Sequence, residues 1–373
     1  MRIRAVSYTF LRHALSPLYG DAQGLKTHRM GILLRLDTDD GITGWGDIAS
    51  RQDFHATHLR LAREMALGAD AWQAAPLVDR LGAFGPRIAA GFDIALADIR
   101  GKAAGVDAAT LLGGRFRDSQ PCYASLQNSN EATDVVADAV AQAEHAASLG
   151  FKQVKMKVGW HHPDTDARWV NAVLAALPED VPLAIDANRV LTLAGAERLL
   201  RGIEQPDRIS WFEEPLSNLH PLAYCELRTR TGVPIAGAES MPLAMIRDVV
   251  AGRMMDIVQP DLIGHGGFAP MRALMDLCDI NGVLLIPHCF DGQLLRVATL
   301  HLLASRPDWE EKHWICEAAP LEVDISPNPL RDELFTANLV PDAQGRVKVP
   351  SGAGLGVEVN EDFVRRVGET MTL

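Results

Sequence analysis

The chain has 373 residues, 47% hydrophobic and 23% charged, with a formal net charge of −12. This composition is ordinary for a soluble globular enzyme with a large core, and the length favours two domains. The negative charge argues against a nucleic-acid or anionic-membrane partner, and no apolar run approaches the roughly 20 residues that span a bilayer.

The N-terminal residues, MRIRAV, enter an alternating strand pattern at once. Because this start lacks the charged and then apolar segments of a signal peptide, the sequence predicts a cytoplasmic protein. Five scattered cysteines form no CxxC pair, which argues against a zinc site or a disulfide framework. They are Cys122, Cys225, Cys278, Cys289 and Cys316.

The first 50 residues are predicted to be rich in strands. Ile32–Leu36 has the composition of a strand, Asp39–Gly41 that of a turn, and Ile42–Gly46 that of a returning strand, which together predict a hairpin. Residues 11–28 contain glycine, proline and histidine and are predicted to form a long loop, of the kind that often serves as a lid.

Residues 55–112 have a helical pattern. Phe92, Ala95, Leu96 and Ile99 repeat at the spacing of one buried helix face, and Gly113 follows the end of this region. The first domain, residues 1–120, is therefore predicted to be an α+β unit.

From residue 121 onward, short apolar strands alternate with helical segments. Eight strands separated by helices predict an α/β fold with a parallel barrel over residues 121–325. A doubly wound sheet would instead need a glycine-rich phosphate loop after an early strand. Residues 326–373 lose the alternation and are expected to pack back on the first domain. The predicted strands are Pro121–Leu126, Gln153–Val158, Leu183–Asp186, Ile209–Glu213, Ile235–Glu239, Ile257–Asp261, Val283–His288 and Trp314–Glu317.

Two lysines end the second predicted strand. Lys155 and Lys157 are two residues apart, so both point to the same face. Inside a barrel, burial would lower the pKa of these amines, as a general base requires. The alternative is an exposed edge strand with solvated lysines.

Three carboxylates, Asp186, Glu213 and Glu239, end the next three strands. A lone carboxylate in such a place is usually a helix cap, but three in successive units form a suitable ligand set for a hard cation such as Mg²⁺. Only one of two adjacent glutamates can face the barrel, and Glu213 is chosen over Glu214. Asn188 shares a face with Asp186 and could contact metal or substrate.

The sixth and seventh predicted strands end at Asp261 and His288, which should be neighbours in a barrel. A carboxylate next to an imidazole fixes its tautomer and raises its basicity. Glu317 ends the eighth predicted strand. It could donate a proton or hydrogen-bond to a substrate carboxylate, or be a structural acid.

A lysine on one side, a histidine on the other and a metal between them suit abstraction of the α-proton of a carboxylate. The enediolate that results has two negative charges on oxygen, which a divalent metal offsets. Reprotonation from the opposite face racemises the substrate, whereas protonation of a β-hydroxyl makes it leave as water.

The order Lys-Met-Lys, Asp, Glu-Glu-Pro, Glu, Asp, His, Glu resembles the enolase superfamily, in its mandelate racemase subgroup. Phe92–Gly114, Asp256–Gly267 and Gly352–Val357 are also similar, so the resemblance covers nearly the whole chain. It implies a modified (β/α)7β barrel and a capping domain built from both termini. Even-numbered homo-oligomers are also expected.

The resemblance also implies a role for each site residue. Mg²⁺ would be held by Asp186, Glu213 and Glu239. Lys157 would be one base, with Lys155 lowering its pKa and contacting substrate. The His288–Asp261 pair would act on the other side, and Glu317 would be the electrophilic partner.

The loops of the first domain contain many polar residues, which favour a polyhydroxylated acid over an aryl substrate. These residues are Arg12, His13, Asp21, Lys26, His28, Arg51, Gln52, Asp53 and His55. The predicted function is therefore dehydration of an acid sugar, a small-molecule carboxylate, to a 2-keto-3-deoxy acid. Racemisation or epimerisation of a 2-hydroxy acid is the alternative. A Schiff-base aldolase and a non-catalytic protein are the other classes considered.

Overall fold

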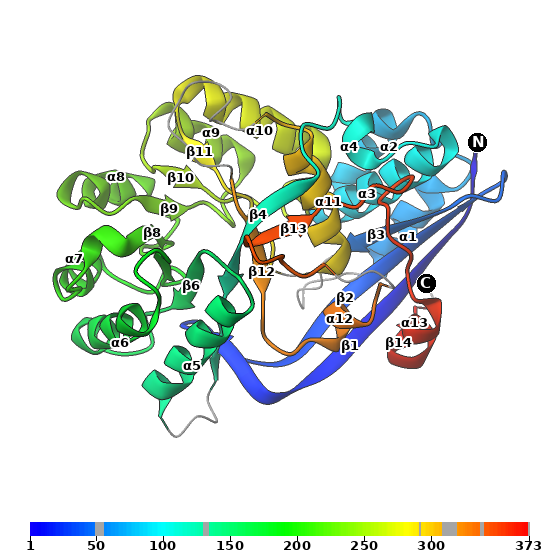
Figure 1. Cartoon of the computed structure of the whole chain (residues 1–373). Coiled ribbons are helices and arrows are strands. Elements are labelled where there is room, and N and C mark those ends of the chain that lie inside the picture. The colour runs from blue at the N-terminus through cyan, green and yellow to red at the C-terminus, as the bar shows by residue number, and fades with distance from the viewer. Residues whose placement is uncertain (49–55, 130–133, 291, 308–318, 336–338, 372–373) are drawn as a thin grey trace.

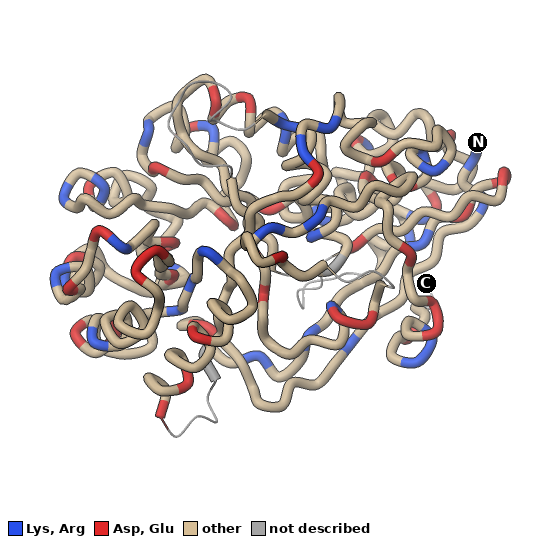
Figure 2. Tube along the Cα trace, in the orientation of Figure 1, with Lys and Arg blue, Asp and Glu red and all other residues tan. Residues whose placement is uncertain are grey.

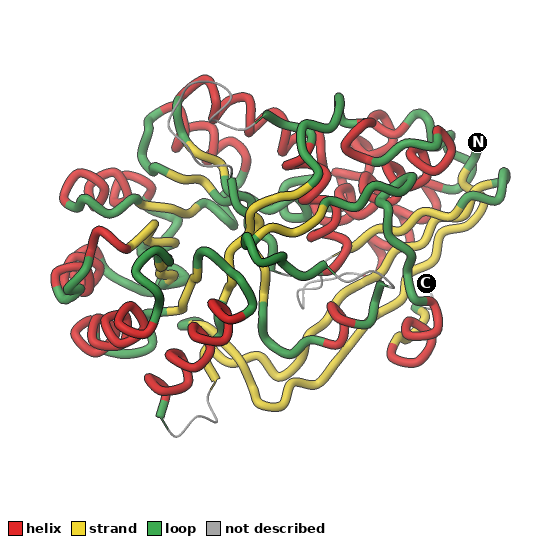
Figure 3. Tube along the Cα trace, viewed as in Figure 1, coloured by secondary structure: helices red, strands yellow, loops and turns green. Residues whose placement is uncertain are grey.

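The computed structural model describes residues 1–48, 56–129, 134–290, 292–307, 319–335 and 339–371. Two sheets organise them, a five-stranded antiparallel sheet and a nine-stranded sheet whose main part is parallel (Figure 1). Helices lie around the outside of the parallel strands (Figure 3). None of the described helices is both long and apolar enough to cross a membrane.

The parallel strands follow the order β11-β10-β9-β8-β7-β6-β4-β12. They are β4 (Ser119–Ser125), β6 (Val154–Lys157), β7 (Leu183–Asp186), β8 (Ile209–Glu213), β9 (Ile235–Gly237), β10 (Ile257–Val258), β11 (Leu284–Leu285) and β12 (Leu321–Asp324). The helices between them are α5 (Val135–Ser148), α6 (Pro163–Ala176), α7 (Leu193–Arg201), α8 (Pro221–Arg230), α9 (Leu243–Ala251), α10 (Phe268–Asn281) and α11 (Gln293–Ala304). This order confirms the predicted modified (β/α)7β barrel.

The last barrel strand lies later in the chain than expected. The strand paired in parallel with β4 is Leu321–Asp324, whereas the predicted Trp314–Glu317 lies outside the described residues. In β12, Leu321 and Val323 join the hydrophobic core. The intervening Glu322 therefore points to the other side, toward the barrel interior.

The antiparallel sheet has the order β14-β1-β2-β3 and consists of β1 (Ile3–Asp21), β2 (Gly24–Thr38), β3 (Thr43–Ile48) and β14 (Gly368–Thr370), with β5 (Asn128–Ser129) also paired to β1. Its helices are α1 (Ala56–Ala66), α2 (Ala74–Leu81), α3 (Pro86–Ala104) and α4 (Ala108–Leu111). The tail adds α12 (Pro329–Asp332), β13 (Arg346–Lys348), which pairs with β4, and α13 (Glu361–Val367). The pairing of β14 with β1 shows that the C-terminal residues pack against the N-terminal sheet.

The prediction of a loop at residues 11–28 is wrong, because this segment forms the outer part of a long β1–β2 hairpin. Buried Leu11, Leu15 and Tyr19 recur at even spacing, which is the pattern of one strand face. Pro17 lies within a register shift between Ala14 and Tyr19, whereas Gly20 and Gly24 pair in register at the end of the hairpin. The end of the hairpin therefore consists of paired strands, and its residues line one cavity together with residues of the barrel.

Two buried aspartates of α3 hydrogen-bond to backbone groups in other parts of the chain. Asp93 accepts a hydrogen bond from the Phe268 N–H at 2.8 Å. Asp98 accepts from the N–H groups of Trp45, at 3.1 Å, and Leu355, at 3.0 Å. These bonds connect the capping helix with the barrel and with the C-terminal tail.

Replacing Asp98 with Ala should lower the free energy of unfolding, because two buried N–H groups would lose their acceptor at about 1–3 kcal/mol each. Denaturant unfolding measures the loss. Asp118→Ala, at an exposed carboxylate paired with Arg115, is the matched control. Equal stability of the two variants would show that the Asp98 bonds contribute nothing.

Charged residues of both signs are interspersed on the helices around the barrel (Figure 2). Several form ion pairs between neighbouring helices, such as Arg198 with Asp164 and Arg230 with Glu197. At solvent-exposed positions such pairs contribute little to stability. Removing one partner from the ion pairs buried at the strand ends would cost more, because it would leave an uncompensated buried charge.

Candidate active site

The ends of β6, β7, β8 and β12 bring two lysines against three carboxylates. Lys155 and Lys157 are both buried and extend to the same side of β6, as predicted. The Nζ of Lys155 lies 2.6 Å from Glu213 Oε1, 2.8 Å from Glu322 Oε1 and 3.7 Å from Asp186 Oδ2. The Nζ of Lys157 lies 2.5 Å from Asp186 Oδ2.

The prediction that burial lowers the pKa of these lysines is wrong for the protein alone. Burial does disfavour both ammonium groups, but the carboxylates outweigh it. Glu213 and Glu322 raise the pKa of Lys155, and Asp186 raises that of Lys157. Sequence position showed that the lysines are buried but did not show how close the carboxylates come.

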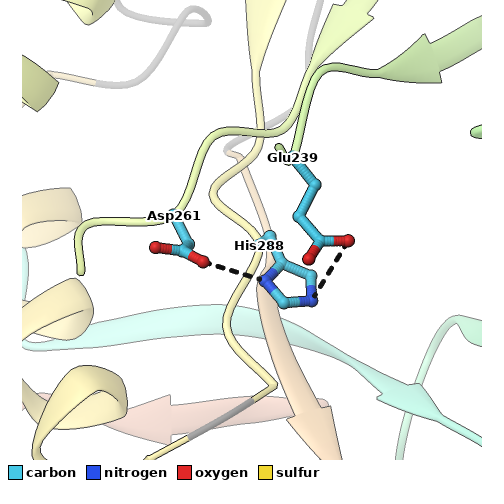
Figure 4. Close-up of side chains that lie close together, drawn as sticks. All are labelled: Glu239, Asp261 and His288. Carbon is cyan, nitrogen blue, oxygen red and sulfur yellow. Dashed lines mark ion pairs between the residues drawn. The ribbon is translucent and has the colours of Figure 1, made fainter. Parts of the chain in front are cut away.

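His288 lies between three carboxylates. Its Nδ1 is 3.6 Å from Asp261 Oδ2, and its Nε2 is 3.9 Å from Glu239 Oε2 (Figure 4) and 3.9 Å from Glu322 Oε2. Burial alone would lower the pKa of His288, but Glu239, Glu322 and Asp261 together raise it to about 10. Burial would raise the pKa of Asp261, which His288 instead lowers to about 2. These contacts favour the imidazolium form of His288 next to the ionised form of Asp261.

One group in the described part of the chain has ligand atoms close enough to hold a metal ion. Glu239, Asp261 and His288 offer atoms within 4.8 Å of one another. The predicted ligands Asp186 and Glu213 are register partners on β7 and β8, and their oxygens contact the lysines. Only Glu239 belongs to both sets.

Glu214 faces away from the lysines. Its Oε2 lies 3.1 Å from Arg189 Nε, and its Oε1 accepts from Asn218 at 2.9 Å. Burial and the nearby Glu239 raise its pKa to about 8. Without Glu214, carboxylates still outnumber the cationic groups at the strand ends, where Asp186, Glu213, Glu239, Asp261 and Glu322 contact Lys155, Lys157 and His288. This surplus suits a divalent cation.

Glu213 is oriented by two donors that the sequence prediction did not include. Its Oε2 accepts hydrogen bonds from Trp211 Nε1, at 3.1 Å, and Gln259 Nε2, at 2.8 Å. Trp211 precedes Glu213 by two residues, and Gln259 precedes Asp261 by two. The period of a strand could therefore have placed both on the interior face.

Glu317 lies outside the described residues, within 308–318. Glu322, on β12, was missed. Besides contacting Lys155 and His288, it accepts a hydrogen bond from the Cys289 N–H at 3.0 Å. Burial alone would raise the pKa of Glu322, but Lys155 and His288 hold this pKa well below its usual range. Glu322 stands between two apolar residues, Leu321 and Val323, which are both buried. This alternation could have identified Glu322 as an interior residue of a strand.

A cavity of about 530 Å³ lies between the barrel and the capping hairpin. Lys157, Asn188, Glu239 and His288 line its barrel side, and Asp21, Gln23, Lys26, His28, Arg29 and Asp47 line its capping side. Leu25, Met30 and Phe290 add apolar surface. Residues 51–55 lie outside the described residues, and Arg12 and His13 are not among the lining residues.

Asn188 joins the hairpin to the barrel. Its carbonyl accepts a hydrogen bond from Gln23 at 2.9 Å, and its N–H donates to Asp186 at 2.9 Å. Its side-chain Oδ1 is buried without a hydrogen-bond partner among the described residues. That oxygen is free to accept from a bound molecule.

Comparisons with known proteins agree with this architecture. A family described as "Enolase C-terminal domain-like" matches residues 138–363. The D-galactarolactone cycloisomerase of Agrobacterium fabrum is 32% identical over 97% of each chain. The arabinonate dehydratase of Saccharolobus solfataricus is 29% identical over 91% of each chain.

Solved structures are similar over the whole fold. The 3,6-anhydro-D-galactonate cycloisomerase of Zobellia galactanivorans has a TM-score of 0.85 at 26% identity, covering 99% of this chain and all of its own. The L-talarate dehydratase of Polaromonas sp. JS666, complexed with Mg and L-glucarate, has a TM-score of 0.81 at 26% identity, covering 99% and 98%. The chain belongs to the enolase superfamily, among acid-sugar dehydratases, cycloisomerases and mandelate racemase-like proteins.

Proposed function

We propose that the protein removes the α-proton of an acid-sugar carboxylate and eliminates the β-hydroxyl as water, giving a 2-keto-3-deoxy acid. The observation that supports this most is the placement of Lys157 and His288 on one cavity, from strands on different sides of the barrel. One can act as base and the other as acid on the same substrate.

Mg²⁺ is the proposed cofactor, held by Asp186, Glu213 and Glu239. The surplus of buried carboxylates fits a hard cation, and a similar dehydratase structure contains Mg. When bound, the cation would offset the charge that develops on the substrate carboxylate. Engaging these carboxylates would also weaken their effect on Lys157 and lower its pKa toward that of a base.

Each side chain then has a defined task. Lys157 accepts the α-proton, and Lys155 contacts the substrate carboxylate. His288, whose Nδ1 lies 3.6 Å from Asp261 Oδ2, donates a proton to the leaving hydroxyl. Glu322 positions Lys155 and is proposed as the acidic group of the last strand, in the place first assigned to Glu317.

Cycloisomerisation is a second candidate, because the relative that is 32% identical over 97% of the chain is a cycloisomerase. The same α-proton abstraction would then expel a ring oxygen of a lactone or anhydro sugar. The product would be an isomer of the substrate. Racemisation of a 2-hydroxy acid, the other alternative, would also conserve mass but would form no keto group.

Product analysis distinguishes these reactions. The Mg²⁺-loaded enzyme is incubated with a panel of open-chain acid sugars, their lactones and simple 2-hydroxy acids, and products are followed by mass spectrometry and keto-acid detection. Dehydration predicts a keto acid lighter by one water from an open-chain acid. A keto acid of unchanged mass, formed from lactones alone, would replace dehydration with cycloisomerisation. Inverted configuration without a keto acid would establish racemisation.

Glu213→Gln should weaken Mg²⁺ binding and lower activity at limiting Mg²⁺. Changes to groups around metal ligands commonly cost about 10–100-fold in affinity, and loss of a ligand's charge should cost at least as much. Titration calorimetry with Mg²⁺ measures the effect, with Glu204→Gln, at an exposed residue before β8, as control. Unchanged affinity would remove Glu213 from the ligand set.

A further inference from the structure

We propose that Arg29 binds a second carboxylate at the far end of the substrate, so that the enzyme prefers diacid sugars to monoacid sugars. This inference rests on the proposed function and specifies its substrate class. Arg29 belongs to β2 of the capping hairpin and lines the cavity.

The guanidinium of Arg29 is held in place by the barrel. Its Nη2 donates hydrogen bonds to Asp324 Oδ2, at 3.3 Å, and Ser326 Oγ, at 3.1 Å. Its central carbon lies 4.6 Å from the ring centroid of Phe290, another cavity residue. The side chain is only 12% exposed, so its position is fixed before a ligand binds.

Both hydrogen bonds found for Arg29 within the described residues use Nη2, and Nε is buried without a partner there. A guanidinium presents five N–H donors in a planar fork that matches a carboxylate. Because Nη1 makes no hydrogen bond within the described residues, this end of the guanidinium, on a side chain that lines the cavity, is available to an anion.

The height of Arg29 above the reaction centre suits a six-carbon diacid. Asp324 follows Glu322 by two residues on β12, so it lies on the same face roughly 7 Å nearer the mouth. Glu322 contacts Lys155 and His288, whereas Asp324 contacts Arg29. A chain of about six carbons, with bonds of about 1.5 Å, spans a comparable distance.

The charge around Arg29 also favours an anion. Arg331 lies 3.9 Å from Asp324 and 2.6 Å from Asp332. Buried Arg296 is close to the same groups, and burial together with Arg331 lowers its pKa to about 10. These contacts place Asp324 and Asp332 beside the three arginines, and Asp21, Asp47 and Glu239 also line the cavity. A substrate carboxylate near Arg29 would have three guanidinium groups close to it.

The test compares a hexaric acid with the hexonic acid of the same configuration. Wild type, Arg29→Met, Arg29→Lys and Arg4→Met are assayed with both acids, and binding to the Mg²⁺-loaded proteins is measured by calorimetry. Arg4 lies on β1 of the same sheet, is exposed and does not line the cavity, so its variant should behave as wild type.

We expect wild type to prefer the diacid in kcat/KM by about 10–100-fold, and Arg29→Met to lose this preference while its hexonate activity stays within about threefold. Arg29→Lys should retain part of the preference. Because the readout is a ratio, loss of active protein in a destabilised variant cancels. Equal use of both acids by wild type, or equal losses in Arg29→Met, would overturn the proposal and leave Arg29 a structural link. If neither acid reacts, the binding ratio alone decides the role of Arg29, and the panel of acid sugars and lactones decides the proposed function.

Discussion

Replacing Lys157 with Met is expected to lower kcat/KM for dehydration by about 10²–10⁴-fold, the usual contribution of a positioned acid or base. The buried Nζ of Lys157 lines the cavity, 2.5 Å from a carboxylate of the proposed metal set. The variant should also lose exchange of the substrate α-proton with solvent, because no other lysine among the described residues lines this side of the cavity. Steady-state kinetics and exchange in D₂O measure the two effects.

Lys152→Met is the matched control, since Lys152 is exposed and lies just before β6. Thermal unfolding in Mg²⁺ checks that Lys157→Met remains folded, because removing one partner of a buried ion pair can itself destabilise a protein. A folded variant that still exchanges the α-proton at the wild-type rate would exclude Lys157 as the base.

Replacing His288 with Asn is expected to reduce dehydration by a similar factor, about 10²–10⁴-fold, while α-proton exchange continues. Asn removes the proton donor but keeps a polar group facing Asp261, and Lys157 and the proposed metal ligands remain. The variant should therefore form the deprotonated substrate and return it without expelling the hydroxyl. Comparison of the dehydration and exchange rates in one sample measures this separation.

His145→Asn, at an exposed position on α5, provides the control for this substitution. Full dehydration by His288→Asn would show that the His288–Asp261 pair is not the acid. Loss of exchange in His288→Asn, together with its survival in Lys157→Met, would reverse the two roles.

The alternation of strands and helices predicted the barrel well because most of the strands are short and apolar and end at or near a charged residue. Leu183–Asp186 and Ile209–Glu213 have the predicted bounds. Parallel strands bring their ends to one mouth, so the meeting of Lys155, Asp186 and Glu213 followed from the alternation alone.

The capping hairpin and the last strand were less predictable. The composition of residues 11–28 suggested a loop, but these residues form the end of the β1–β2 hairpin, and Tyr19 and Gly20 also pair with β5. The pairing with β5 joins residues far apart in the sequence and has no local signal. Glu322 was missed because the eighth strand was placed seven residues too early. Arg29 could not be connected to Asp324 by any periodicity, since the two residues meet only through the docking of the hairpin on the barrel.

Proton NMR of the Mg²⁺-loaded enzyme in D₂O, with open-chain acid sugars, tests the central claim most directly. We predict that the C2 proton of the substrate disappears as a 2-keto-3-deoxy acid forms, and that solvent deuterium enters the product at C3. A keto product whose new C3 hydrogen comes from the substrate and not from solvent, or persistence of the C2 proton in every acid of the panel, would contradict α-proton abstraction.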